Sequence, residues 1–150
     1  MTTSLYDSDF YAWTQLVCDR LRDRHLTDAD LEHIAEEIAG LGNRDRRELF
    51  SRMTVLLMLH MKWAAQPDRR DNSTWKATID EQREQIAYIL EDSPSLTARL
   101  VREMPKLQSR AVRKASEETG MPASIFTRND ISRLDHLLSS DWYPESLDQF

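Results

Sequence analysis

Residues 50–64 have the sequence FSRMTVLLMLHMKWA, the most apolar stretch of the chain. Its apolar positions recur every three or four residues, which is the spacing of one face of an α-helix. They are Phe50, Met53, Leu56, Leu57, Met61 and Ala64. Because this apolar arc is wide, we expect the helix to lie at the centre of the fold. Asn43 can cap its start, and Pro67 ends it because proline has no N–H to donate.

The same spacing precedes this stretch and predicts two earlier helices. Asp7 can cap the first. Thr27 and Asp30 resemble the two ends of a capping box, in which each side chain bonds the other residue's backbone N–H. The box opens a second helix, and we expect Gly42 to end it.

Two more main helices and a short one are predicted after Pro67. Ser73 can cap the first of them, and Ser93 the next, which ends at Gly120. Pro105 lies inside that last helix and predicts a kink or break near Arg102–Met104. A short helix over Ser132–Leu138 follows.

The composition supports an all-α fold. The chain has 150 residues with only 3 glycines and 5 prolines, too few for the many tight turns of a β-sandwich or barrel. We predict one domain, residues 1–150, built as an antiparallel helical bundle of about five main helices plus a short C-terminal helix.

Charge and cysteine content limit the function classes. The formal net charge of −6 argues against a protein that mainly coats nucleic acid, because such binding depends on neutralising phosphates. The single cysteine, Cys18, can form no internal disulfide, and no apolar run is long enough for a membrane span. We expect a cytoplasmic protein that does not bind membranes.

Short motifs spread along the chain resemble one bacterial family. They include YDSDFYAWT at residues 6–14, Ala35–Ile38, Trp63, Glu81–Arg83 and Glu117–Gly120, with Asp141–Trp142 near the end. In this order they are similar to the domain of unknown function 29 family, which is common in cyanobacteria. The resemblance implies an all-α helical fold. It implies no activity, substrate or catalytic residue.

The sequence carries no motif of a common enzyme class. A phosphate-binding loop, a dinucleotide-binding fingerprint, a nucleophile elbow and a His-Glu-x-x-His metal motif are all missing. We therefore assign no catalytic residue, expect no cofactor and regard an enzyme as the less favoured class.

Several polar residues fall on or beside the predicted apolar faces and form a candidate inward polar cluster: Glu37, Arg46, His60, Gln82 and Arg83. One interpretation is a ligand or metal site built from Glu37, His60 and Gln82. The favoured one is a structural network in which Arg46 pairs with Glu37 across the turn at Gly42, because buried polar groups need partners. Two arginines near the cluster oppose a divalent cation, so we expect no metal.

A second candidate feature is a basic stripe on the predicted helix that ends at Gly120, formed by Arg99, Arg102, Lys106, Arg110 and Arg113. Their spacing of three or four residues places them on one face, away from the apolar residues. The stripe could dock an acidic partner or a nucleic-acid backbone. The alternative is a solvated face neutralised by Glu103, Glu117 and Glu118.

Three functions follow from these features, in order of preference. The first is a non-enzymatic helical module that binds a protein partner or a second copy of itself. The second is a nucleic-acid-linked regulator or antitoxin-like partner that uses the basic stripe. The third is an enzyme or ligand-binding bundle that uses the inward polar cluster.

Overall fold

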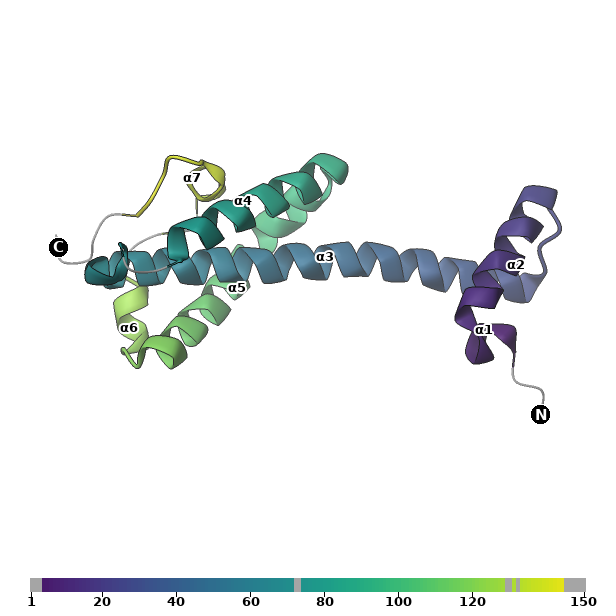
Figure 1. Cartoon of the computed structure of the whole chain (residues 1–150), viewed down its shortest axis with the longest axis horizontal. Helices are drawn as coiled ribbons and strands as arrows, with labels where there is room; N and C mark the ends of the chain where they lie inside the picture. Colours follow the sequence, from purple (N-terminus) through teal and green to yellow (C-terminus); the bar gives the residue numbers. More distant parts are fainter. Residues whose placement is uncertain (1–3, 72–73, 129–130, 132, 145–150) are drawn as a thin grey trace. The chain divides into compact units, whose positions relative to one another are not determined.

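The computed structural model describes residues 4–71, 74–128, 131 and 133–144. Within these residues the chain is mostly helical and has no strand, which confirms the all-α prediction. The helices, shown in Figure 1, are α1 (Leu5–Ser8), α2 (Phe10–Asp23), α3 (Asp28–Ala65), α4 (Trp75–Asp92), α5 (Leu96–Thr119), α6 (Ala123–Phe126) and α7 (Leu134–Leu138), with a 3-10 turn, η1, at Pro67–Arg69. The predicted starts at Ser73 and Ser132 lie outside the described residues.

The predicted helix end at Gly42 and cap at Asn43 are wrong. α3 runs without interruption from Asp28 to Ala65, so two predicted helices are one, and four long helices replace the expected five. A glycine ends a helix by adopting a left-handed conformation. Gly120, which ends α5, does so with φ 71°, whereas Gly42 does not. A glycine inside a helix costs only about 1 kcal/mol relative to alanine. The residues that follow Gly42 include three arginines and Glu48, which have high helix propensity and offset this cost.

Pro105 does not break α5, so of the predicted kink or break near Arg102–Met104 the break is wrong. The helix continues from Leu96 to Thr119 with Pro105 inside it. Proline removes the hydrogen bond that would reach the carbonyl of Val101. Both Pro105 and Val101 lie on the exposed side of α5, where water can bind that carbonyl.

The chain forms two compact units, residues 1–44 and residues 45–150. The first contains α1, α2 and the beginning of α3. Its buried apolar side chains are Trp13 and Val17. The capping box is confirmed: the Thr27 N–H donates to Asp30 Oδ2 at 3.2 Å, and the Asp30 N–H donates to Thr27 Oγ1 at 3.1 Å. Arg20 joins α2 to this box by donating to both carboxylate oxygens of Asp30, at 2.9 and 3.2 Å.

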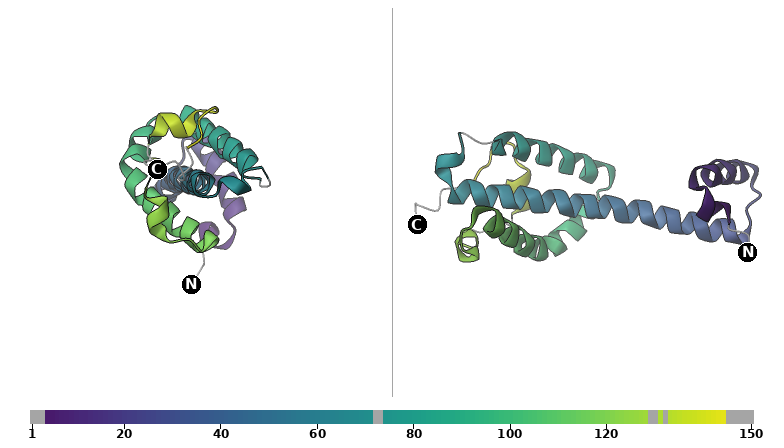
Figure 2. Two further views of the ribbon diagram at one scale, coloured as in Figure 1. Left: turned by 90° about the vertical axis from the view of Figure 1, so that its left-hand side faces the viewer. Right: turned by 60° about the horizontal axis from the view of Figure 1, so that its bottom comes forward.

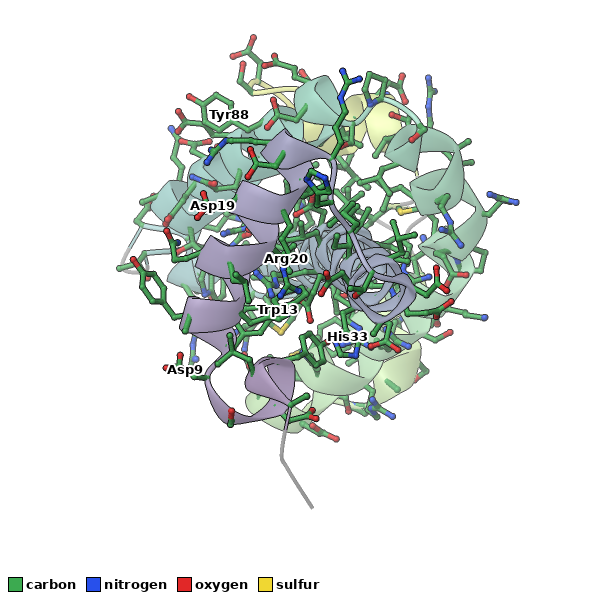
Figure 3. All side chains as sticks on the ribbon, turned by 90° about the vertical axis from the view of Figure 1, so that its right-hand side faces the viewer. Asp9, Trp13, Asp19, Arg20, His33 and Tyr88 are labelled. Carbon is green, nitrogen blue, oxygen red and sulfur yellow. The ribbon has the colours of Figure 1, made fainter. Side chains whose placement is uncertain are left out.

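Figure 3 shows how α2 faces α3 within the first unit. Trp13 and Arg20 point into the space between the two helices, whereas Asp19 lies on the opposite side of α2. The Tyr6 ring packs edge-on against Trp13 at 4.8 Å between centroids and lies 4.0 Å from the His33 ring. α1 is therefore held to α2 and α3 by aromatic contacts.

The second unit is built around the remaining part of α3. α4 and α5 lie on different sides of it (Figures 1 and 2). Leu56 and Leu57 of α3 are fully buried, together with Ile79 of α4 and Leu100 and Leu107 of α5. This confirms that the stretch 50–64 lies at the centre of the packing.

Candidate functional site

The residues of the inward polar cluster do not form one site. Glu37 belongs to the first unit, where it accepts a hydrogen bond from Tyr6 Oη at 2.5 Å. Gln82 accepts one from Arg52 Nη1 at 3.3 Å. His60 and Arg83 are in contact, with His60 Nε2 and Arg83 Nη2 3.0 Å apart. The structure thus joins only this pair among the five predicted residues that it describes.

The turn at Gly42, on which the predicted pair between Glu37 and Arg46 depends, is not formed. Both residues lie on the uninterrupted helix α3, nine positions apart. There is no turn to bring them together, and Tyr6 is the hydrogen-bond partner of Glu37. Its carboxylate raises the pKa of Tyr6 to about 12, because an anion that accepts the phenol's hydrogen bond disfavours phenolate.

His60 is fully buried on α3 and is held in one tautomer by its two neighbours. Its Nδ1 lies 2.8 Å from the Leu56 carbonyl oxygen, which can only accept, so Nδ1 carries the proton. Nε2 is then free to accept from Arg83. Burial lowers the pKa of His60 to about 4, against the effect of the Leu56 carbonyl, and the charge of Arg83 lowers it further. The imidazole is therefore neutral at pH 7.

Arg83 of α4 binds the C-terminal segment through main-chain carbonyls. Its Nε donates to Leu137 at 2.8 Å, Nη1 donates to Ser140 at 3.3 Å and Nη2 donates to Trp142 at 2.5 Å. Tyr143 stacks under the guanidinium at 5.2 Å. Burial lowers the pKa of Arg83, against the effect of Tyr143 and of nearby carboxylates. All these partners belong to the folded chain itself. The His60–Arg83 pair therefore holds the segment Leu137–Tyr143 against α3 and α4.

The described residues include no recognisable metal centre. In the part of the chain that the structure describes, no three His, Cys, Asp or Glu side chains are grouped closely enough to hold a metal ion. Glu37, His60 and Gln82, the three residues of the ligand interpretation, have separate partners.

A surface pocket in the second unit contains residues from both sequence-predicted groups. It is lined by Arg46 and Phe50 of α3 and by Arg99, Arg102 and Glu103 of α5. Its volume is about 180 Å³. Arg46 Nε is buried and has no hydrogen-bond partner among the described residues. We call this feature the arginine pocket. The sequence does not reveal it because the meeting of α3 with α5 is a tertiary contact.

The basic stripe is exposed along its whole length. Lys106 Nζ lies 3.9 Å from Glu103 Oε1, one of the acidic neighbours expected to neutralise the stripe. Glu118, another of them, is bound instead by Lys62 of α3 at 2.7 Å. Among described residues, no carboxylate lies within ion-pair distance of Arg110 or Arg113. The C-terminal part of the stripe, Arg110 and Arg113, therefore has less compensation than its sequence neighbours suggested.

The first unit exposes many large apolar side chains. On α3 they form a seam, Leu31, Ile34, Ile38 and Leu41, in which Leu31, Ile38 and Leu41 are 51%, 63% and 56% exposed and Ile34 is half-buried. Phe10, Tyr11, Leu16 and Leu21 of α2 are exposed as well. Single exposed leucines are ordinary, but a contiguous apolar surface on so short a segment is not. We call the four α3 residues the apolar seam.

Comparison with known proteins identifies the family. The sequence profile described as "Domain of unknown function DUF29" matches residues 5–143. The chain belongs to the DUF29 family. This DUF29 chain shows significant similarity to no curated protein and to no solved structure. Within the described residues, no helix of this family member is both long and apolar enough to cross a bilayer.

Proposed function

We propose that this DUF29 chain is a helical protein-interaction module whose partner is a second copy of the same chain. The observation that carries the proposal is the exposed apolar seam of the first unit. Its residues lie three, four and three positions apart, which is the a/d spacing of a coiled-coil interface. The two helices that pack on this part of α3, α1 and α2, leave the seam uncovered.

A second copy matches the seam by symmetry. In a two-fold interface each surface contacts its own equivalent. Leu31 and Leu41 are equally distant from position 36, and so are Ile34 and Ile38. An antiparallel pair centred there sets leucine against leucine and isoleucine against isoleucine. Two helical hairpins that meet in this way form a four-helix bundle, which buries both apolar faces.

Charge favours the antiparallel over the parallel arrangement. The segment begins with acidic Asp28 and Glu32 and ends with basic Arg44, all three exposed. Antiparallel copies bring the acidic start of one beside the basic end of the other. Parallel copies bring the two acidic starts together, where like charges repel.

The experiment is sedimentation equilibrium of the full chain over a wide concentration range. We expect a monomer–dimer equilibrium that Ile38→Glu shifts strongly toward monomer. The matched control is Gly40→Glu, which adds the same charge on the other side of α3. A side chain at Gly40 meets no atom within 4 Å, so this control should fold and dimerise. A wild-type chain that is monomeric at every concentration, or equal effects of both variants, contradicts the proposal.

Salt separates self-association from charge-driven binding. Residues 1–44 contain four basic and nine acidic residues, a net charge of −5. Two such units repel, and added salt screens that repulsion. The proposed dimer should therefore tighten, or stay unchanged, as sodium chloride is raised. A dimer that dissociates in salt would point to an interface held by opposite charges.

A second candidate function is binding of a polyanion, such as a nucleic-acid backbone, through the basic stripe. It is favoured by the exposure of all five side chains and by the engagement of Glu118 with Lys62. The net charge of −6 weighs against it. Its test is the salt dependence of DNA binding in variants of Arg110 and Arg113.

A further inference from the structure

The arginine pocket brings three guanidinium groups and one carboxylate to a single concave surface. Arg46 comes from α3, and Arg99, Arg102 and Glu103 come from one turn of α5. The formal charge of these four groups is +2. We propose that this pocket binds a phosphate-type oxyanion, either free phosphate or the phosphomonoester group of a small molecule. The site lies in the second unit and does not depend on the proposed self-association.

One donor atom of Arg46 has no acceptor among the described residues. Its Nε is buried without a hydrogen-bond partner among the described residues. A buried donor left unpaired is costly, so such groups usually have a partner. Arginine holds its donors in a planar fork that fits two oxygens of a phosphate or carboxylate. An anion in the pocket would also relieve repulsion between the guanidinium groups.

The pocket is large enough for this ligand. A volume of about 180 Å³ equals roughly six water molecules at about 30 Å³ each. A tetrahedral oxyanion fits with room for part of an attached group. Phe50 forms an apolar wall of the pocket and packs against the hydrophobic core, so it gives the attached carbon skeleton a fixed surface.

Glu103 adds selectivity among oxyanions. Its carboxylate can accept hydrogen bonds but cannot donate them when ionised. Phosphate and its monoesters, whose last proton has a pKa near 6 in phosphoserine and similar groups, can present a P–OH to it. Sulfate carries no proton near neutral pH and would face the carboxylate with oxygen lone pairs alone. The pocket should therefore prefer phosphate to sulfate.

The experiment titrates the full chain with sodium phosphate at constant ionic strength. Calorimetry measures the binding, and thermal unfolding measures the change in unfolding temperature. Phosphate should bind with saturation and raise the unfolding temperature, as a ligand of the folded state must. Arg102→Gln should weaken binding about tenfold or more, and Arg46→Gln should act in the same direction. Because Arg102 is exposed, its variant should fold even if the Arg46 variant does not.

The matched control is Arg110→Gln, on the same helix and in the same basic stripe but outside the pocket lining. It removes the same charge and should change phosphate affinity less than about twofold. Equal losses in the Arg102 and Arg110 variants would show diffuse attraction to a basic surface and overturn the proposal. So would absence of saturable phosphate binding to the wild-type chain.

Binding of three ligands, glycerol 3-phosphate, inorganic phosphate and sulfate, shows whether the pocket takes a phosphomonoester or free phosphate. Glycerol 3-phosphate that binds more tightly than inorganic phosphate supports a phosphomonoester ligand, and equal or weaker binding supports free phosphate. Sulfate should bind more weakly than both, and Glu103→Gln should reduce this difference. Sulfate binding as tight as phosphate binding in the wild-type chain would contradict the assigned ligand class.

Discussion

Arg83 Nη2 lies 3.0 Å from His60 Nε2, so a buried cation of α4 donates its hydrogen bond to a buried neutral imidazole of α3. The same guanidinium binds the carbonyls of Leu137, Ser140 and Trp142. Protonation of His60 would place two positive charges in contact and remove the acceptor. The stability of the second unit is therefore coupled to the neutral form of one histidine.

The first prediction concerns pH. The pKa of His60 is lowered by burial to about 4 in the folded chain, against 6.5 for an ordinary histidine. The unfolded chain therefore takes up the proton first, and folded-state stability is present in full above pH 6.5 and falls as the pH drops toward 4. The loss is roughly 3 kcal/mol at about 1.4 kcal/mol per pKa unit.

Urea unfolding at several pH values measures this dependence. His60→Gln cannot titrate, so the difference in unfolding free energy between wild type and variant should shrink as the pH falls from 6.5 to 4. Comparison with this variant removes the contributions of carboxylates, which titrate in both chains. A constant difference over that range would refute the role assigned to His60.

The second prediction concerns Arg83. Arg83→Gln leaves several buried acceptors without donors, so we expect a loss of about 3 kcal/mol or more in unfolding free energy. Hydrogen exchange should also rise in residues 137–143, which the guanidinium holds. The control is Arg52→Gln, which breaks the partly exposed contacts of Arg52 with Glu48 and Gln82 and should cost no more than about 1 kcal/mol. Unchanged exchange in residues 137–143 would show that Arg83 is not what holds this segment.

The third prediction tests the continuity of α3. Gly42 lies inside the helix, and an added Cβ there meets no atom within 4 Å. Gly42→Ala should therefore stabilise the chain by up to about 1 kcal/mol. The same substitution at Gly120 should destabilise it, because that residue has φ 71° at the end of α5. Destabilisation by Gly42→Ala would support a turn at this position.

Sequence periodicity predicts most of the fold because each helix carries its own apolar stripe. The buried face of residues 50–64 and the capping box at Thr27 and Asp30 are local patterns, and the structure confirms both. The prediction at Gly42 is wrong because glycine is compatible with either a helix or a helix end. Its backbone conformation decides between them, and a sequence does not report conformation.

The contacts of the candidate sites are harder to predict. Arg83 binds main-chain carbonyls, which every residue possesses and which leave no signal in a sequence. The aromatic residues Trp142 and Tyr143 near the end of the chain are the one hint that this segment is packed. The bond from Tyr6 to Glu37 depends on how α1 folds back on α3, which no local pattern encodes. Arg46 stands out in the sequence as a polar residue on an apolar face, but its neighbours come from α5.

The last prediction concerns the basic stripe outside the arginine pocket. Arg110 and Arg113 are exposed on α5, so Arg110→Gln with Arg113→Gln should leave the fold intact. If the stripe binds a nucleic-acid backbone, removing one phosphate-binding side chain lowers the steepness of log affinity against log salt concentration by about one unit. The double variant should therefore bind duplex DNA more weakly at low salt, and its salt dependence should be about two units shallower. The control removes two basic residues off the stripe, Arg69→Gln with Lys76→Gln, and should leave the slope unchanged. Equal slopes for wild type and both variants would mean that Arg110 and Arg113 are solvated and contact no polyanion.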